Sequence, residues 1–206
     1  FSSMFNARAV LDGVSLSKED SIGDQLAVPF FNLTDNGLHP AHIWAMPFDG
    51  EGTPTRSLPL IGNGELKNFL HSEATARRFG VTPTGHAGMG AKVSVGPDWF
   101  EIARTPNTTT DADHLYHTTT SDTFVLVESL NALHAGVKAS QGAFLLPFDG
   151  WLVNNGERTS IEAATIAGDI RDVLQSIVQI ERTPVVTHEG VCPHIWVDSL
   201  AITGDA

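Results

Sequence analysis

The apolar residues of this chain occur in short runs that end at turn-forming residues, and this pattern constrains the fold more than any other feature. Glycine, asparagine, aspartate or proline follows most of the runs, and the chain holds 19 glycines and 11 prolines. Short apolar runs bounded by such residues are typical of strands joined by tight turns. The pattern therefore favours a sheet-rich fold over a helical bundle.

The clearest hairpin signature is the turn at residues 62–64, Gly-Asn-Gly, which separates the stretches 57–61 and 65–70. Glycine and asparagine tolerate the positive φ angles of tight hairpin turns, so the two stretches are predicted to pair as antiparallel strands. Further strands are predicted at residues 28–33, 124–128, 143–146, 151–153 and 160–165, and residues 195–197 with 200–202 are predicted to form one final strand.

Three segments are predicted to be helical. Ser72–Phe79 begins with a residue suited to cap the first turn and is followed by Gly80, a typical stop. Asp169–Ile180 carries apolar residues at helical spacing, and its first residue can accept a free backbone N–H. Ala7–Leu16 carries a weaker pattern. The predicted fold class is α+β, a mainly antiparallel β-sheet with a few helices.

The charge balance excludes some partners. The chain has 24 acidic and 12 basic residues, a formal net charge of −12. Nucleic acids and anionic membranes attract basic surfaces, so neither is expected to be a partner. No apolar run approaches the ~18 residues of a membrane span, and no signal-peptide pattern is present, so the expected location is the cytoplasm. The single cysteine cannot form an intrachain disulfide.

One segment near the C-terminus has the residue types of a metal site, since it contains His188, Cys192 and His194. A zinc-binding helix presents two histidines four positions apart on one face. Here the histidines are separated by six positions, with Gly190 and Pro193 between them, so a helix cannot hold them. A loop or strand could still present the three side chains. They are the runner-up ligand set to the expectation of no metal in this chain.

The other reactive groups are predicted to be solvated or structural. No Gly-x-Ser-x-Gly elbow occurs, and a pairing of the lone cysteine with a nearby histidine is a weak candidate for nucleophilic catalysis. The glycine-rich segment 85–90 lacks the flanking strand and helix of a phosphate loop, and close approach to an extended peptide suits it better. Solvated loops or turn caps are predicted for Asp111, Asp113, His114 and His117, for His39 and His42, and for Asp49 and Glu51.

Two further features concern the organisation of the chain. The tetrapeptide Pro-Phe-Asp-Gly occurs at 47–50 and again at 147–150, which would fit either an internal duplication or coincidence. The chain opens on Phe1, and its first residues read like the inside of a helix or connector. The 206 residues are therefore expected to be one domain of a longer chain. The N-terminal domain of that longer chain is expected to be absent from this sequence.

Several motifs in order resemble the C-terminal domain of the TldD/PmbA family, also called modulator of DNA gyrase. The likeness spans nearly the whole chain, with two departures: Asp-Gly replaces the family's Asp-Asp at 49–50, and Gly-His-Ala replaces Gly-Asn-Ala at 85–87. The motifs that carry it lie at residues 47–56, 60–70, 75–81, 83–87, 142–144, 155–157, 165–169 and 202–204.

The resemblance implies a function. The family forms a two-subunit peptidase that processes or degrades small or unfolded peptides. Its TldD-like subunit binds zinc through a helical His-Glu-x-x-x-His motif and a cysteine, and its PmbA-like (TldE) subunit lacks the motif. That motif is absent from these residues. The resemblance therefore implies a non-metal PmbA/TldE-like subunit without a cofactor of its own, paired with a zinc-binding TldD-like subunit or with itself.

Two alternatives remain open from the sequence. The chain could belong to a metallopeptidase whose ligands lie in a segment outside it, or to a non-enzymatic regulator linked to DNA gyrase. Whether the chain is itself part of an enzyme is therefore left open. The predicted peptide-contact residues are Thr84, Gly85 and His86.

Overall fold

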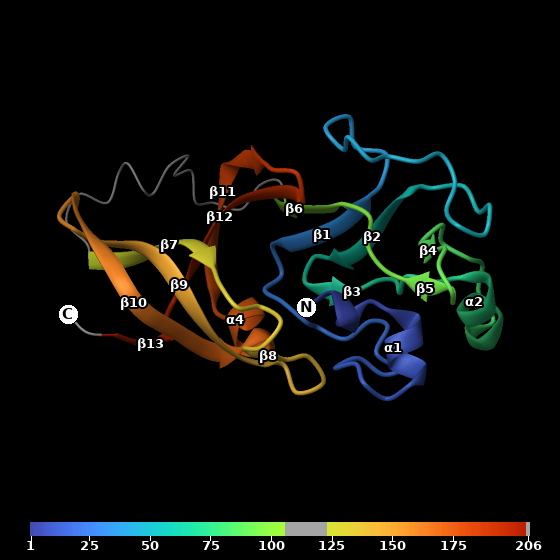
Figure 1. Ribbon diagram of the computed structural model, residues 1–206, viewed down its shortest axis with the longest axis horizontal. Helices are drawn as coiled ribbons and strands as arrows, with labels where there is room; N and C mark the ends of the chain where they lie inside the picture. Colours follow the sequence, from blue (N-terminus) through green and yellow to red (C-terminus); the bar gives the residue numbers. More distant parts are fainter. Residues whose placement is uncertain (106–122, 205–206) are drawn as a thin grey trace.

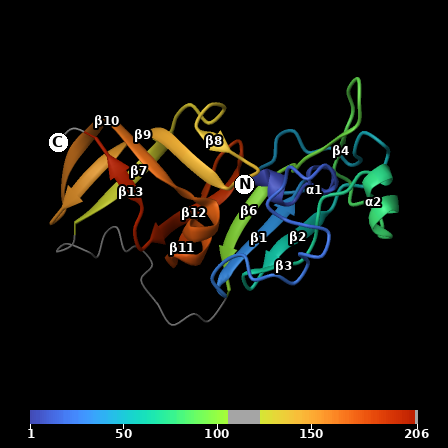
Figure 2. The ribbon, with the colours of Figure 1, turned by 90° about the horizontal axis from the view of Figure 1, so that it is seen from below.

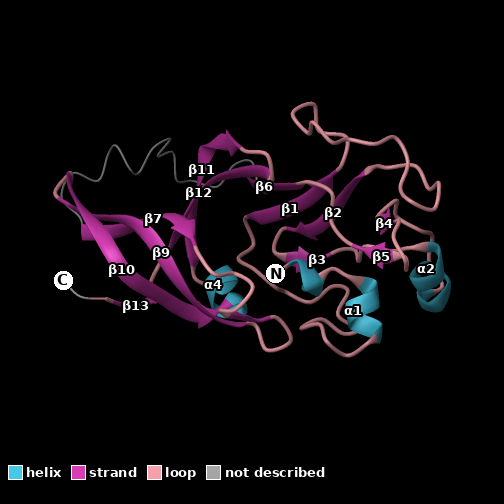
Figure 3. Cartoon of the chain, viewed as in Figure 1, coloured by secondary structure: helices cyan, strands magenta, loops and turns pink. Residues whose placement is uncertain are grey.

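The computed structural model describes residues 1–105 and 123–204, and its fold is α+β, as predicted from the sequence. Within these described residues, the chain forms three sheets and a few short helices. A five-stranded sheet lies at one end, a six-stranded sheet lies in the middle, and loops with helix α2 lie at the other end (Figures 1 and 2). The colouring by secondary structure shows that strands dominate (Figure 3).

The six-stranded sheet has the order β11-β12-β6-β1-β2-β3. Its described neighbours pair antiparallel, except that β12 pairs parallel with β6. The strands are β1 (Phe31–Asn36), β2 (Ser57–Gly62), β3 (Glu65–Leu66), β6 (Phe100–Arg104), β11 (Ile177–Val186) and β12 (Gly190–Val197).

The five-stranded sheet is antiparallel, with the order β13-β10-β9-β7 and with β8 paired to β9. A third sheet pairs β4 with β5 near helix α2. These strands are β4 (Ala87–Gly88), β5 (Ser94–Val95), β7 (Thr123–Leu130), β8 (Val137–Lys138), β9 (Ala143–Asn154), β10 (Glu157–Asp169) and β13 (Ala201–Thr203).

The helices are short. They are the 3₁₀ turn η1 (Ser2–Met4), α1 (Ala7–Leu11), α2 (Glu73–Phe79) and α4 (Ile170–Gln175). Helix α2 confirms its predicted caps, because the Ser72 side chain accepts from a backbone N–H of the first turn and Gly80 adopts the left-handed conformation. The Gly-Asn-Gly hairpin is confirmed as the turn between β2 and β3.

Two helix predictions were too long. The segment predicted as a helix to Ile180 is helical only to Gln175, and from Ile177 it forms strand β11. Pairing with β12 and burial of Ile177 and Ile180 outweigh the helical spacing of the apolar residues. Asp169 does cap α4, as predicted. Helix α1 ends at Leu11 rather than Leu16.

The main core lies between the six-stranded sheet and the N-terminal helices, with Phe5, Phe31, Leu33, Leu60, Ile61, Leu66, Leu70 and Ile180 among its fully buried side chains. A smaller core of Leu146, Phe148, Ala164 and Ile166 lies on the five-stranded sheet. The main core ends at one edge in a buried polar group, Asp35, and this edge carries the pocket described below.

Three sequence predictions need comment. The two Pro-Phe-Asp-Gly segments differ in structure, since 47–50 lies in a loop and 147–150 lies within β9, so they give no evidence of duplication. The cluster at Asp111–His117 lies outside the described residues. Among the described residues, no helix is long and apolar enough to cross a membrane.

Candidate functional site

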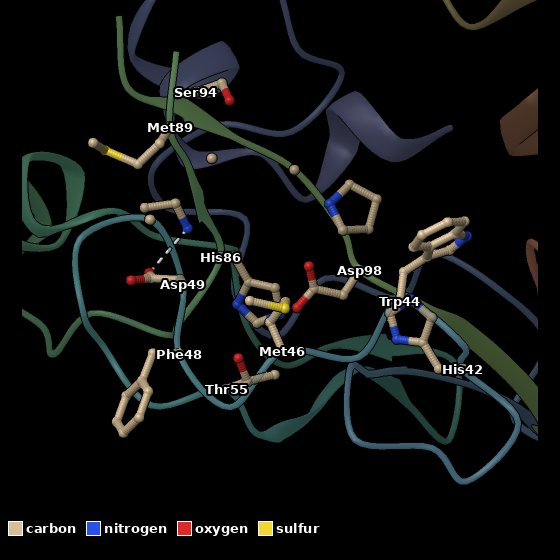
Figure 4. A pocket seen from close by; sticks show the side chains of 15 residues that line it. His42, Trp44, Met46, Phe48, Asp49, Thr55, His86, Met89, Ser94 and Asp98 are labelled. Carbon is tan, nitrogen blue, oxygen red and sulfur yellow. Dashed lines mark hydrogen bonds between the residues drawn. The ribbon is translucent and has the colours of Figure 1, made fainter.

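A pocket of about 450 Å³ opens beside the ends of β1 and β6. Its walls come from the loop between β1 and β2, from β4 and the residues around it, and from the segment that leads from β5 to β6. Figure 4 shows how the lining side chains converge from these segments. The rim carries large exposed apolar side chains: Trp44, Met46, Phe48 and Met89.

Asp35 lies behind the pocket, with no exposed surface. It lies on the inward face of β1, two positions after Leu33 and four after Phe31. Backbone N–H groups fix its carboxylate, because Trp99 donates to Oδ1 at 2.9 Å and Asp98 donates to Oδ2 at 2.9 Å. The end of β1 is thus tied to the start of β6 through a buried acidic side chain.

Asp98 is exposed at the pocket wall, just before β6. The backbone of Gly37 approaches its side chain closely. A Cβ atom at Gly37 would lie 2.7 Å from Asp98 Oδ2 and 2.7 Å from Thr55 Cγ2, both nearer than real contacts allow. The absence of a side chain at Gly37 therefore leaves the space that the Asp98 carboxylate occupies.

His86 immediately precedes β4, and its side chain is fully buried. Its Nδ1 atom lies 2.8 Å from Thr84 Oγ1, and its Nε2 atom lies 3.6 Å from Asp35 Oδ2. Thr84 Oγ1 in turn accepts from the backbone N–H of His71 at 2.7 Å and donates to the carbonyl of His71 at 3.2 Å. Among the described residues, His86 Nε2 has no hydrogen-bond partner.

Two residues hold the backbone around His86. Gly85 has a φ of +83°, and a Cβ atom there would lie 2.5 Å from the carbonyl oxygen of Pro54. Asp49 accepts from the backbone N–H groups of Glu51 and Thr53, and also from that of Ala87 at 3.0 Å. Asp49 therefore caps its own turn, as predicted, and attaches that turn to β4.

Burial shifts the pKa of two carboxylates and two histidines at and behind the pocket wall. It raises the pKa of Asp35, against the hydrogen bonds from Trp99 and Asp98. Desolvation at the pocket wall, and then the nearby Asp35 carboxylate, raise the pKa of Asp98. Burial lowers the pKa of His86 and takes that of His71 to about 4. Carboxylates and an imidazole that are each costly to charge thus face one another.

The predicted peptide-contact residues lie at this site in two layers. His86 lines the pocket, whereas Thr84 and Gly85 are buried behind it and support it. The sequence analysis placed His42 in a solvated loop, but its ring packs against Trp99 at 4.8 Å between centroids and lines the pocket. Asp35 and Asp98 were not identified from the sequence. The one signal for Asp35 was its position in the inward register of β1.

The runner-up metal ligands are not brought together. The side chains that are brought together are Asp35, His86 and Asp98, whose potential ligand atoms all lie within 4.8 Å of one another. They form the one such group of three or more among the described residues. His188 is exposed in the turn between β11 and β12. Cys192 lies on β12, and His194 Nδ1 lies 3.2 Å from Glu181 Oε2.

Comparison with known proteins assigns the domain. A family model described as the PmbA/TldA metallopeptidase C-terminal domain matches residues 1–204. The chain belongs to this PmbA/TldD metallopeptidase family. The family resemblance inferred from the sequence motifs is therefore confirmed.

Individual members of the family support the same assignment. A Thermotoga maritima structure, of a protein named as a candidate modulator of a DNA gyrase, is 31% identical, with a TM-score of 0.85. TldE from Thermococcus kodakarensis has the same fold, at 22% identity and a TM-score of 0.80. Each comparison covers 98% of this chain and 46% of the solved chain.

A curated relative, the metalloprotease PmbA homolog of Haemophilus influenzae, is 26% identical over 84% of this chain. The chain spans 37% of the length of that relative.

Proposed function

We propose that this domain is part of a PmbA/TldE-like subunit that lacks the family's peptidase metal motif and acts with a zinc-binding TldD-like subunit. The complex would act in the cytoplasm on small or unfolded peptides. The similarity to proteins named PmbA and TldE supports this choice within the family.

One observation carries the proposal. The only His-Glu pair of the sequence, His188-Glu189, lies exposed in the β11–β12 turn, where the backbone N–H of Thr187 donates to the carbonyl of Gly190 at 2.9 Å. The family's zinc motif needs a helix that places both histidines on one face. A three-residue turn between strands cannot supply that geometry, so these 206 residues do not carry the motif in any shifted form.

The pocket would contribute to peptide binding. Its apolar rim offers contact area for a peptide side chain, and its acidic interior favours a peptide with a positive charge. We expect the peptide to bind extended, as an added strand beside the pocket, with His86 in the wall behind it. In this proposal Thr84 and Gly85 keep the wall in place.

The direct test is reconstitution. The full-length protein that contains this domain is purified alone and together with the TldD-like subunit of the same organism. Hydrolysis of an unstructured peptide library is then followed by mass spectrometry. We expect hydrolysis only by the mixture, with the two chains eluting together and zinc in the TldD-like chain. Hydrolysis by the full-length protein alone, at the rate of the mixture, would contradict the proposal.

A second test concerns the pocket. Trp44 is 74% exposed at the rim, so its replacement by alanine should leave the fold intact. We expect Trp44→Ala to raise the KM of the reconstituted complex for peptides several-fold. The matched control is Leu133→Ala, which removes an exposed apolar side chain that does not line the pocket. Equal KM values for the two variants would show that the pocket does not contribute to peptide binding.

A further inference from the structure

The pocket contains a group of side chains that peptide binding does not explain. Asp35, His86 and Asp98 come from β1, from the residue before β4 and from the residues before β6, yet their ligand atoms lie within 4.8 Å of one another. We propose that these three side chains bind a divalent transition-metal cation, such as zinc or manganese, at a site separate from the family's His-Glu-x-x-x-His motif.

The distance between His86 and Asp35 fits a bridging ion better than a direct contact. His86 Nε2 lies 3.6 Å from Asp35 Oδ2, which is too far for a hydrogen bond, and a charge-assisted one would be shorter still, about 2.7–2.9 Å. Two ligand atoms that each lie about 2.1 Å from one ion in tetrahedral geometry are about 3.4 Å apart. The observed gap therefore has the size of a shared cation.

The environment of His86 Nδ1 fixes the ring as it is fixed in metal-binding histidines. In the tautomer in which the Thr84 hydroxyl gives its proton to the His71 carbonyl, His86 Nδ1 carries the N–H of the pair, and Nε2 presents a lone pair to Asp35. A histidine that binds a metal usually donates its other ring N–H to such a partner. In the opposite tautomer, Nε2 would carry a buried N–H 3.6 Å from the Asp35 oxygen and without a hydrogen bond.

Charge and coordination are consistent with the same conclusion. Two carboxylates and a neutral imidazole carry a charge of −2, which a divalent cation neutralises, and imidazole nitrogen with carboxylate oxygen suits zinc or manganese. Asp35 keeps free lone pairs, because two backbone N–H groups occupy only part of its acceptor capacity. Asp98 is exposed and has room to close on the ion. Three protein ligands leave positions open toward the pocket.

The inference differs from the sequence-based expectation of no metal in this chain, and it does not depend on the subunit role proposed above. Figure 4 shows Asp98 and His86 among the side chains that line the pocket, so an ion that they held would lie at its wall. A bound cation would also join the ends of β1 and β6 to β4.

The test uses the full-length protein after removal of metals by a chelator. Zinc and cobalt(II) are titrated separately and followed by calorimetry and, for cobalt, by visible absorption. The variant is Asp98→Asn, which removes an exposed ligand and leaves the buried ones in place. The matched control is Asp20→Asn, the same substitution at an exposed aspartate that does not line the pocket.

We expect the wild type and Asp20→Asn to bind one equivalent more than Asp98→Asn, or to bind it at least about tenfold more tightly. In ¹⁵N spectra of the imidazoles, the Nε2 resonance of His86 should move on addition of zinc. Equal stoichiometry and affinity in the two variants would overturn the proposal. So would a His86 ring that keeps protons on both nitrogens at saturating zinc, which would show a buried ion pair instead.

Discussion

Two buried carboxylates of this protein lie beside a histidine, and their surroundings differ. In the β11–β12 hairpin, Glu181 accepts from Trp196 Nε1 at 3.1 Å and lies 3.2 Å from His194 Nδ1. The His194 side chain is 54% exposed, whereas that of Glu181 is 2% exposed. In the pocket, Asp35 and His86 are both fully buried and face one another at 3.6 Å without a hydrogen bond.

The difference separates a complete polar arrangement from an incomplete one. Each oxygen of Glu181 has a side-chain partner, and water can reach the histidine, so this pair needs nothing more to be stable. Asp35 is held by the backbone, and the ring nitrogen that faces it has no partner among the described residues. A buried polar atom without a partner costs stability, and a bound water, a bound ion or a catalytic role is a common explanation for one.

The largest effect is expected for Asp35→Ala. The change removes the acceptor of two buried backbone N–H groups, those of Asp98 and Trp99, and detaches the end of β1 from the start of β6. We expect the free energy of unfolding to fall by about 3 kcal/mol, measured by urea denaturation. The control Asp98→Ala should cost less than about 1 kcal/mol, since it is exposed. Similar losses for the two variants would contradict this account of Asp35.

Acid should destabilise the buried region through His71. Its folded pKa of about 4 lies below the unfolded value of about 6.5, so the unfolded chain binds more protons between them. The stability contributed by neutral His71 is complete above about pH 6.5 and is lost as the pH falls toward 4. Between pH 7.5 and pH 5 the loss should be about 2 kcal/mol.

The measurement must separate the pH dependence that His71 causes from that of the neighbouring titratable groups. The raised pKa values of Asp35 and Asp98 act in the opposite direction, because these groups gain protons more readily when folded. The readout is therefore the difference in unfolding free energy between wild type and His71→Asn, which should shrink on acidification. The matched control is His188→Asn, which makes the same substitution at an exposed turn away from the buried region.

A smaller effect is expected when the support of His86 is changed. Thr84→Val keeps the shape of the side chain but removes the hydroxyl that pairs with His86 Nδ1 at 2.8 Å. Loss of such a supporting bond typically weakens metal affinity 10–100-fold, so we expect zinc affinity at the pocket to fall by that factor. Thr84→Ser should retain most of the affinity. If serine and valine weaken zinc binding equally, the hydroxyl has no positioning role.

The smallest effect is expected in the hairpin. Trp196→Phe removes the N–H that donates to Glu181 but keeps most of the ring that packs against Phe124. We expect a loss of about 1 kcal/mol in unfolding free energy, since His194 remains available to Glu181. Trp44→Phe, at the exposed rim of the pocket, is the control and should be neutral. A loss as large as that of Asp35→Ala would mean that the two carboxylates do not differ in the way described.

The parts of the structure that the sequence predicted are those fixed by local chemistry. The turn at Asn63 and Gly64 and the caps of α2 depend on neighbouring residues alone, and both were correct. The helix expected to reach Ile180 stops at Gln175, because pairing with β12 is a long-range contact that spacing does not report. The family could be identified because its motifs recur in order along the whole domain.

The site was only partly predictable for the same reason. His86 was selected from a glycine-rich segment, but its partners were not. Asp35 lies just beyond the strand predicted at 28–33, yet it continues the alternation of Phe31 and Leu33 into the core. Asp98 had no signal of its own. The two carboxylates meet His86 only because β1 pairs with β6, an association that tertiary structure decides.

The parallel pairing of β12 with β6 has a consequence for the synthesis of the protein. Gly190 pairs with Phe100 across almost half the chain, so one edge of β6 has no partner until the C-terminal hairpin has left the ribosome. Edge strands that wait unpaired are sites of aggregation, and pairings between distant segments form slowly. Strand β6, which directly follows Asp98 of the pocket wall and the buried Trp99, is therefore among the last to be covered. Premature termination before the hairpin would yield an incomplete, aggregation-prone sheet.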